Sequence, residues 1–238
     1  MMKMTGELTA RVGFEDTIPT AFGYIGIGIA FGIIGQSNHL SVLEIILMSL
    51  ITYAGSAQFV IVSMAALHAN ILSIVLSVFL VNSRMILMST VIAPYMKKES
   101  LLRNVWIGTL LTDETFALSM NKLNYTDHRL SYSWFNSANL TAYLTWFAAS
   151  GIGGALGNLI TNPEQFGLGF ALVAMFIGLL YLQIITDKTI RLGIQLGVVG
   201  FVAVVMYLGL AVIPENILLL IAALLGCTFG VTLKHVLR

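Results

Sequence analysis

The stretch Ser49-Leu-Ile-Thr-Tyr-Ala-Gly-Ser-Ala-Gln-Phe59 places polar residues at the centre of an apolar run that extends from Leu40 to Leu67. A run of this length can be embedded in lipid, because a crossing helix needs about 20 apolar residues. Hydrocarbon contains no water to satisfy polar groups, so such a cluster is tolerated where protein buries it or where it lines a wet cavity. A polar, glycine-broken centre in an apolar segment is typical of a substrate site in a membrane transporter.

The composition of the whole chain agrees with a membrane location. Its 238 residues are 58% hydrophobic and 10% charged, whereas soluble domains are about 25% charged. We therefore predict an all-α, polytopic integral membrane bundle that forms a single transmembrane transporter domain over residues 1–238. The formal net charge of +1 argues against a nucleic-acid partner.

Cysteine and histidine usage leaves little room for metal or disulfide chemistry. Cys227 is the single cysteine, which excludes an internal disulfide and a thiolate metal cluster. The four histidines are scattered without metal-ligand spacing, so we expect no metal and no cofactor. Glu7, Glu15 and Asp16 precede the first apolar run, which argues against a cleavable signal peptide and for a first segment that stays as an anchor.

Eight apolar segments follow one another with short connections. They cover residues 18–36, 40–67, 71–95, 101–120, 134–160, 166–185, 192–213 and 216–233. Basic loops tend to stay in the cytoplasm, and eight plain crossings would place Lys97, Lys98 and Arg103 outside. If segments two and four instead enter and return on the same side, every basic loop becomes cytoplasmic. This second model has six full crossings of the inner (cytoplasmic) cell membrane, with both termini on the cytoplasmic side; eight crossings, or seven, are the alternatives.

The first candidate site is the polar centre of segment two. Gly55 permits a break or a close approach of backbone, and Ser56 and Gln58 offer hydrogen-bond donors and acceptors beside Tyr53. The end of a half-helix there would present free N–H groups and a partial positive charge to a substrate carboxylate. In the alternative interpretation, the serine and the glutamine simply bridge neighbouring helices.

Two further candidates are charged residues deep in apolar segments. Arg84, close to Asn82, lies about ten residues before the basic end of segment three, and an arginine at that depth needs a partner or a wet cavity. Asp113 and Glu114 are adjacent acids inside segment four. One acid can pair with Arg84, while the other binds a substrate ammonium or carries a coupling proton. The alternatives are a purely structural ion pair and acids that lie near water at the end of a short segment.

Small residues at four-residue spacing predict close helix packing. Gly28 and Gly32 lie in the first segment, and Gly153 and Gly157 lie in the fifth. Such spacing lets two helix backbones approach each other in lipid. Pro19 is expected to begin the first helix, where its missing N–H costs nothing.

The motifs occur in an order that resembles a known family, the AzlC-type permeases, over roughly residues 10–230. The pieces that carry the resemblance are Pro19 with the glycine-rich run after it, Met48-Ser-Leu-Ile-Thr-Tyr-Ala-Gly-Ser-Ala-Gln58, Asn82-Ser-Arg84 with Pro94, and Leu111-Thr-Asp-Glu114. The Ala-Gly-Ser-Ala-Gln block is the most specific of them. One departure is Met85, where the family pattern leads us to expect histidine or another ring, so this position has no titrating side chain here.

The resemblance implies a function that composition does not. It implies the large subunit of a two-component exporter of valine, leucine and isoleucine, with methionine as a further candidate, that draws on the proton gradient. A small hydrophobic AzlD-type membrane subunit is the implied partner. Two other function classes remain open: a non-transporting scaffold or assembly subunit, and an intramembrane hydrolase with Ser56 as nucleophile and His68 as base. The hydrolase is disfavoured because no histidine lies deep in a segment.

Overall fold

The computed structural model describes residues 6–157, 159–160, 167, 170–186, 190–213 and 215–236. Throughout these ranges the regular structure is helical, with no strand, so the predicted all-α class is confirmed. The contacts divide the chain into two compact units, Met1–Leu179 and Leu180–Arg238. Each unit is described by itself, and the prediction of one transporter domain over the whole chain stays a prediction.

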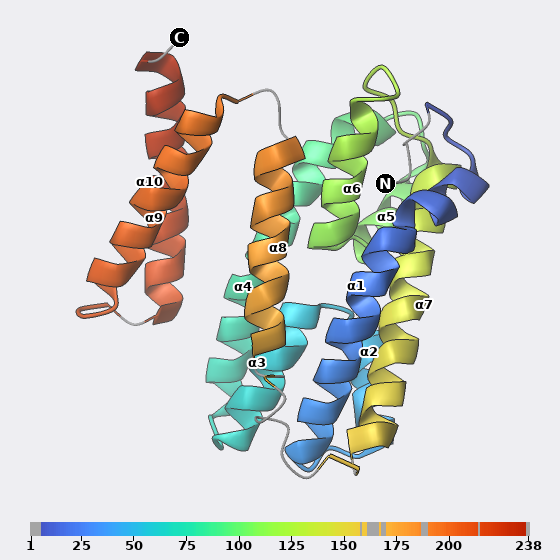
Figure 1. Ribbon diagram of the computed structural model, residues 1–238, viewed down its shortest axis with the longest axis vertical. Helices are drawn as coiled ribbons and strands as arrows, with labels where there is room; N and C mark the ends of the chain where they lie inside the picture. Colours follow the sequence, from blue (N-terminus) through green and yellow to red (C-terminus); the bar gives the residue numbers. More distant parts are fainter. Residues whose placement is uncertain are drawn as a thin grey trace. The chain divides into compact units, whose positions relative to one another are not determined.

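The first unit holds most of the helices (Figure 1). They are α1 (Ala10–Ser37), α2 (Val42–Ile51), α3 (Gly55–Ala66), α4 (Ile71–Ile92) with the 3-10 turn η1 (Ala93–Met96), α5 (Leu101–Thr109), α6 (Asp113–Leu123) and α7 (Tyr132–Gly157). Helix α8 (Ala171–Thr186) crosses the boundary between the units. Among the described residues, three helical stretches are long and apolar enough to span a membrane: Ala10–Ser37, Ile71–Met96 and Leu192–Gly209.

The second unit contains an antiparallel pair, α9 (Leu192–Gly209) and α10 (Glu215–Val236). Gly226 faces Val202 and Gly230 faces Val198, so the numbering rises along one helix as it falls along the other. The rings of Phe201 and Phe229 stack between them with centroids 4.3 Å apart.

Helix α1 begins earlier than its apolar run suggests. Thr9 caps it, with its hydroxyl accepting a hydrogen bond from the Val12 N–H at 3.4 Å. The first two turns are polar and therefore escape a search for apolar runs. The expectation that Pro19 begins the helix is wrong, because Pro19 lies inside α1, where it removes the N–H that would bond to the carbonyl of Glu15.

Segments two and four are both broken, as predicted. The break in segment two lies between α2 and α3. Contacts with successive turns of α7 show the direction in which the chain runs. Ile45, early in α2, lies against Gly154 near the end of α7, whereas Gly55 at the start of α3 lies against Trp146 nearer its middle. Helix α3 then returns, so that Ala66 ends close to the start of α4 (Figure 1). The pair is a re-entrant hairpin.

Helices α5 and α6 form the second re-entrant hairpin, which enters from the opposite end of the unit (Figure 1). The Arg103 guanidinium lies over the Tyr132 ring, 4.8 Å from its centroid, at the start of α7. The Ile107 carbonyl accepts a hydrogen bond from Asn139, two turns further along α7, at 3.3 Å. Helix α6 turns back toward the first turn of α7. The two hairpins thus point their tips at each other.

The glycines of α1 and α7 hold these two helices together. A Cβ at Gly32 would lie 2.2 Å from the Ser150 carbonyl oxygen, and one at Gly153 would lie 2.2 Å from the carbonyl oxygen of Ile29. Backbones that approach this closely leave no room for a side chain, which is the arrangement that small-residue spacing allows in lipid. The helix-packing interpretation therefore describes these glycines.

Candidate substrate site

A small cavity lies where the tips of the two hairpins meet. Its lining comes from both breaks and from three long helices: Tyr24, Tyr53, Ala54, Gly55, Ser56, Met85, Thr112, Asp113, Glu114 and Trp146. The room for the centres of water-sized molecules is about 20 Å³, which suffices for about one water molecule. In this conformation the cavity is therefore closed in the sense that an amino acid does not fit in it.

The N-terminus of α3 forms one wall and keeps its free donors. Ala54 is the N-cap residue and offers no side-chain hydrogen bond to the first turn. The N–H groups of such a turn point outward and carry a partial positive charge. The turn itself falls at Tyr53, whose φ of 36° lies in the left-handed region. A tyrosine held there is under backbone strain, a feature that clusters at functional sites.

Gly55 allows a side chain of another helix to approach the backbone closely, and it does not form the turn. A Cβ at this position would lie 2.9 Å from the Trp146 ring. Of the two roles that the sequence left open, a break or an approach, the structure places the break one to three residues earlier. The buried hydroxyl of Tyr53 makes no hydrogen bond to the described residues, although its ring meets the Tyr143 ring edge-on at 4.7 Å.

Arg84, Asp113 and Ser56 come together from three helices. The Arg84 guanidinium forms an ion pair with the Asp113 carboxylate at 2.7 Å and donates a hydrogen bond to the Ser56 hydroxyl at 2.9 Å. Both charged side chains are largely withdrawn from the surface, with 34% and 15% of their area exposed. One basic group thus joins the tips of the two hairpins across the cavity wall.

Glu114 has a different environment. Its carboxylate accepts a hydrogen bond from the Tyr24 hydroxyl at 2.6 Å, and the same hydroxyl lies 2.8 Å from that of Thr112. Thr112 also begins α6 through a capping box with Thr115. This cap fixes the first turn of the helix, and with it the direction of both acids. Asp113 therefore faces a cation, while Glu114 faces a neutral tyrosine.

Gln58 lies behind the cavity and not in its lining. Its side chain is fully buried, donating to the Ser49 hydroxyl at 3.0 Å and accepting from the Trp146 indole N–H at 2.9 Å. These bonds tie α2, α3 and α7 together. The bridging role that the sequence left open for glutamine is the one that its contacts describe here.

Asn82 lies apart from the other candidates. It lines an apolar groove between α3 and α4 of about 470 Å³, together with Ile61, Ile74, Val75, Val78 and Phe79. Its buried side-chain oxygen accepts no hydrogen bond from the described residues. The structure thus brings Tyr53, Gly55, Ser56, Asp113 and Glu114 onto one cavity, adds Arg84 and Gln58 immediately behind it, and leaves Asn82 outside.

Five residues of the lining were not among the predicted site residues: Tyr24, Ala54, Met85, Thr112 and Trp146. Each is a common constituent of membrane helices and carries no formal charge. The available signal was positional: Thr112 precedes two acids and has a hydroxyl residue three positions later, a pattern that indicates the start of a helix inside an apolar run.

The comparisons with known proteins agree with this architecture. The model of the AzlC protein family matches residues 19–160. The chain is similar to the inner membrane protein YgaZ of Escherichia coli, with 30% identity over 74% of this chain and 73% of that protein. It is also similar to the branched-chain amino acid transport protein AzlC of Bacillus subtilis, with 28% identity over 75% of this chain and 69% of the other.

An uncharacterized membrane protein of Archaeoglobus fulgidus is 28% identical over 80% of this chain and 82% of its own length. No solved structure matches the chain. The family match begins at Pro19 and ends just after α7, so it covers both re-entrant hairpins and every residue that lines the cavity. The chain belongs to the AzlC family and is a membrane transport protein.

Proposed function

We propose that this protein exports branched-chain amino acids, namely valine, leucine and isoleucine, with methionine as a further substrate. Export is driven by the proton gradient, and a small hydrophobic AzlD-type subunit is the partner. The observation that carries this proposal is the Arg84–Asp113 pair, which joins Ser56 on one hairpin to the acids of the other beside a closed cavity. The printed name of the Bacillus subtilis relative supports the substrate class.

The cavity lining is complementary to an amino acid zwitterion. A carboxylate needs donors or a cation, which the free N–H groups of α3, the Tyr53 hydroxyl and Arg84 supply. An ammonium needs an anion, which Asp113 or Glu114 supplies. The Trp146 ring and Met85 add apolar surface for an aliphatic side chain. The same groups would be costly to bury in a protein that only holds other subunits together.

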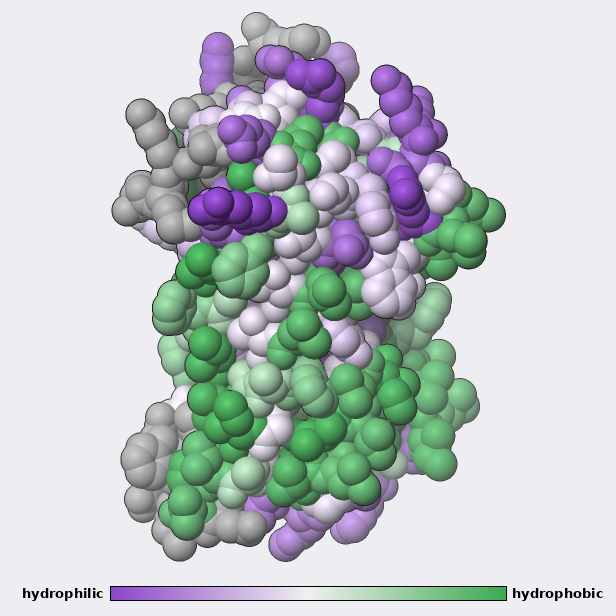
Figure 2. All heavy atoms as spheres, turned by 90° about the vertical axis from the view of Figure 1, so that its right-hand side faces the viewer, coloured by the Kyte–Doolittle hydropathy of each residue, from purple (hydrophilic) through white to green (hydrophobic). Residues whose placement is uncertain are grey.

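Transport requires the cavity to open, because space for one water molecule does not admit an amino acid. Each hairpin enters from a different end of the unit, so movement of one hairpin would open the cavity toward one side of the membrane. We assign the end with Lys97, Lys98 and Arg129 to the cytoplasm, since basic loops favour that side. Figure 2 shows hydrophilic side chains gathered at that upper end, above a broad apolar band.

An efflux assay tests the transport proposal directly. Cells loaded with labelled valine, leucine, isoleucine or methionine should lose label faster when they express this chain with a small AzlD-type subunit. The D113N variant should lose this activity at unchanged membrane abundance, because it removes the anion that faces Arg84. Abundant protein that leaves the accumulation of all four amino acids unchanged, in either combination, would refute the export proposal and favour the scaffold.

Glu114 is the proposed carrier of the coupling proton, because Asp113 is already paired with Arg84. We expect E114Q to abolish efflux driven by the proton gradient while it preserves exchange of labelled for unlabelled substrate. Both rates can be measured in proteoliposomes with and without an imposed gradient. Gradient-driven efflux by E114Q at the parent rate would assign the proton to another group.

A further inference from the structure

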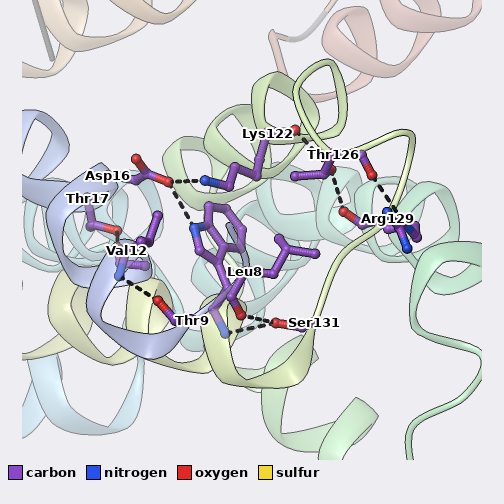
Figure 3. Close-up of polar contacts among 11 residues, drawn as sticks. Leu8, Thr9, Val12, Asp16, Thr17, Lys122, Thr126, Arg129 and Ser131 are labelled. Atoms are coloured by element: carbon purple, nitrogen blue, oxygen red, sulfur yellow. Dashed lines mark hydrogen bonds and ion pairs between the residues drawn. The ribbon is translucent and has the colours of Figure 1, made fainter. Parts of the chain in front are cut away.

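A second buried charge cluster lies at the end of the first unit where α1 begins. The Lys122 ammonium forms an ion pair with the Asp16 carboxylate at 2.7 Å, and their side chains are 0% and 8% exposed. The same oxygen of Asp16 accepts a hydrogen bond from the Trp134 indole N–H at 2.9 Å. The ammonium lies 5.5 Å from the centroid of the Trp134 ring. Figure 3 shows Lys122 of α6 and Asp16 of α1 pointing toward each other.

The position of the cluster relates it to the cavity. Eight residues separate Asp16 from Tyr24 on α1, and eight separate Glu114 from Lys122 on α6. Because Tyr24 contacts Glu114 and Asp16 contacts Lys122, the two helices run antiparallel and are joined by polar contacts at two levels. Eight helical residues span about 12 Å. The ion pair therefore lies two turns beyond the cavity, toward the end of the unit.

The packing of α1 against α7 makes the two polar contacts between α1 and α6 important. Helix α1 packs along α7 far more extensively than against α6, so α1 and α7 form a frame and α6 is a short helix attached to it. On α1, Phe31 lies two turns from Tyr24 in the direction away from Asp16, and it belongs to a buried apolar cluster with Phe59 and Trp146. In the other direction, the contact two turns from Tyr24 is the buried charge pair of Asp16 and Lys122. An ion pair with a specific geometry is either formed or broken. An apolar contact does not have two such defined states.

We propose that Asp16 and Lys122 are positioning residues that lock α6 against α1, so that Glu114 meets Tyr24 and the cavity stays closed toward the α6 end. Separation of the pair releases α6 and opens the cavity to that side. This inference deepens the proposed transport function, and it concerns a conformational equilibrium that can be measured without any substrate.

The test follows access to a cysteine placed in the cavity. Cys227, the single cysteine of the chain, is first replaced in C227A, and A54C then puts a thiol in the cavity lining. The rate of modification by a membrane-impermeant thiol reagent is measured in vesicles of each orientation. In the D16N/K122M background, which removes both charges together, we expect the rate from the α6 side to rise about tenfold, as for a shift between two conformers.

Glu99 and Arg103 provide a matched control. They form an ion pair of 2.8 Å at the same end of the unit, between residues four apart in sequence, with side chains 22% and 56% exposed. Because this pair does not join α6 to α1, E99Q, which breaks it and leaves Arg103 over the Tyr132 ring, should leave both modification rates unchanged. The single variant D16N leaves the buried Lys122 charge without its anion, so it should produce a rise on the same side at least as large as that of the double variant.

The outcomes separate positioning from a general structural role. An equal rise from both sides, or unchanged rates in folded D16N/K122M protein, would overturn the proposal. If D16N/K122M does not fold, the rates of D16N decide, and no one-sided rise in that variant would overturn it as well. A parent protein that fails to export amino acids would refute the proposed function, yet the access measurement would still decide the lock.

Discussion

Replacement of Arg84 by alanine should reduce amino acid efflux at least about a hundredfold, which corresponds to roughly 2.7 kcal/mol. The variant removes the cation that faces Asp113 at 2.7 Å and the donor to Ser56 at 2.9 Å. Truncating one partner of a fully buried, hydrogen-bonded charge pair costs about 2–5 kcal/mol, because the other charge is left uncompensated, and for this partly exposed pair we expect the lower part of that range. The measurement is the initial rate of labelled valine efflux, normalised to membrane abundance.

Two variants sharpen this prediction. R84K keeps the charge but loses the planar fork that reaches two partners at once, so its efflux should lie between the parent and R84A. R103A removes an arginine of which 56% of the side chain is exposed, and its efflux should stay close to that of the parent. Parent-like efflux by R84A at normal abundance would remove Arg84 from the site.

The G32A variant should lower the thermal stability of the protein more than any other small substitution in α1. Its new Cβ would lie 2.2 Å from the Ser150 carbonyl oxygen, 2.4 Å from the Gly154 nitrogen and 2.7 Å from the Gly153 carbonyl carbon. These are backbone atoms, so two helices must separate to relieve the collision. Overpacking of this kind costs about 3 kcal/mol, or a fall in melting temperature of roughly 6–12 °C.

Gly26 on the same helix is the matched control, because a Cβ there would meet no atom within 4 Å. G26A should change the stability by less than about 0.5 kcal/mol. Melting temperatures of both variants in detergent test the pair. Equal melting temperatures for G32A and the parent would show that α1 and α7 are not held at the observed separation.

Much of the architecture follows from two simple rules of the sequence. The length of the apolar runs predicted the segments. The placement of Lys97, Lys98 and Arg103 predicted that segments two and four turn back. Both are broken in the structure, between α2 and α3 and between α5 and α6. These predictions succeed because the cost of exposing charge or backbone to hydrocarbon is large and depends on residue type more than on detailed packing.

The sequence was less informative about partners. The pairing of Arg84 with Asp113 was one of the possibilities considered, since a buried arginine needs an anion. The environment of Lys122 was not foreseen: it lies outside the predicted segments 101–120 and 134–160, yet it is fully buried in the last turn of α6. Its partner Asp16 lies more than a hundred residues away, and a contact across such a separation depends on the tertiary arrangement of three helices.

The opposed re-entrant hairpins also determine how the membrane voltage acts on the protein. In the proposed transporter, a group at their tips would be reached from either side through about half of the hydrocarbon thickness. If Glu114 carries the coupling proton, as proposed, a proton that binds it from one face would have crossed about half of the transmembrane potential, worth roughly 1 kcal/mol per 100 mV. Both the concentration difference of protons and the voltage would then contribute to the occupancy of this site, so that efflux responds to membrane potential even when the pH is equal on the two sides.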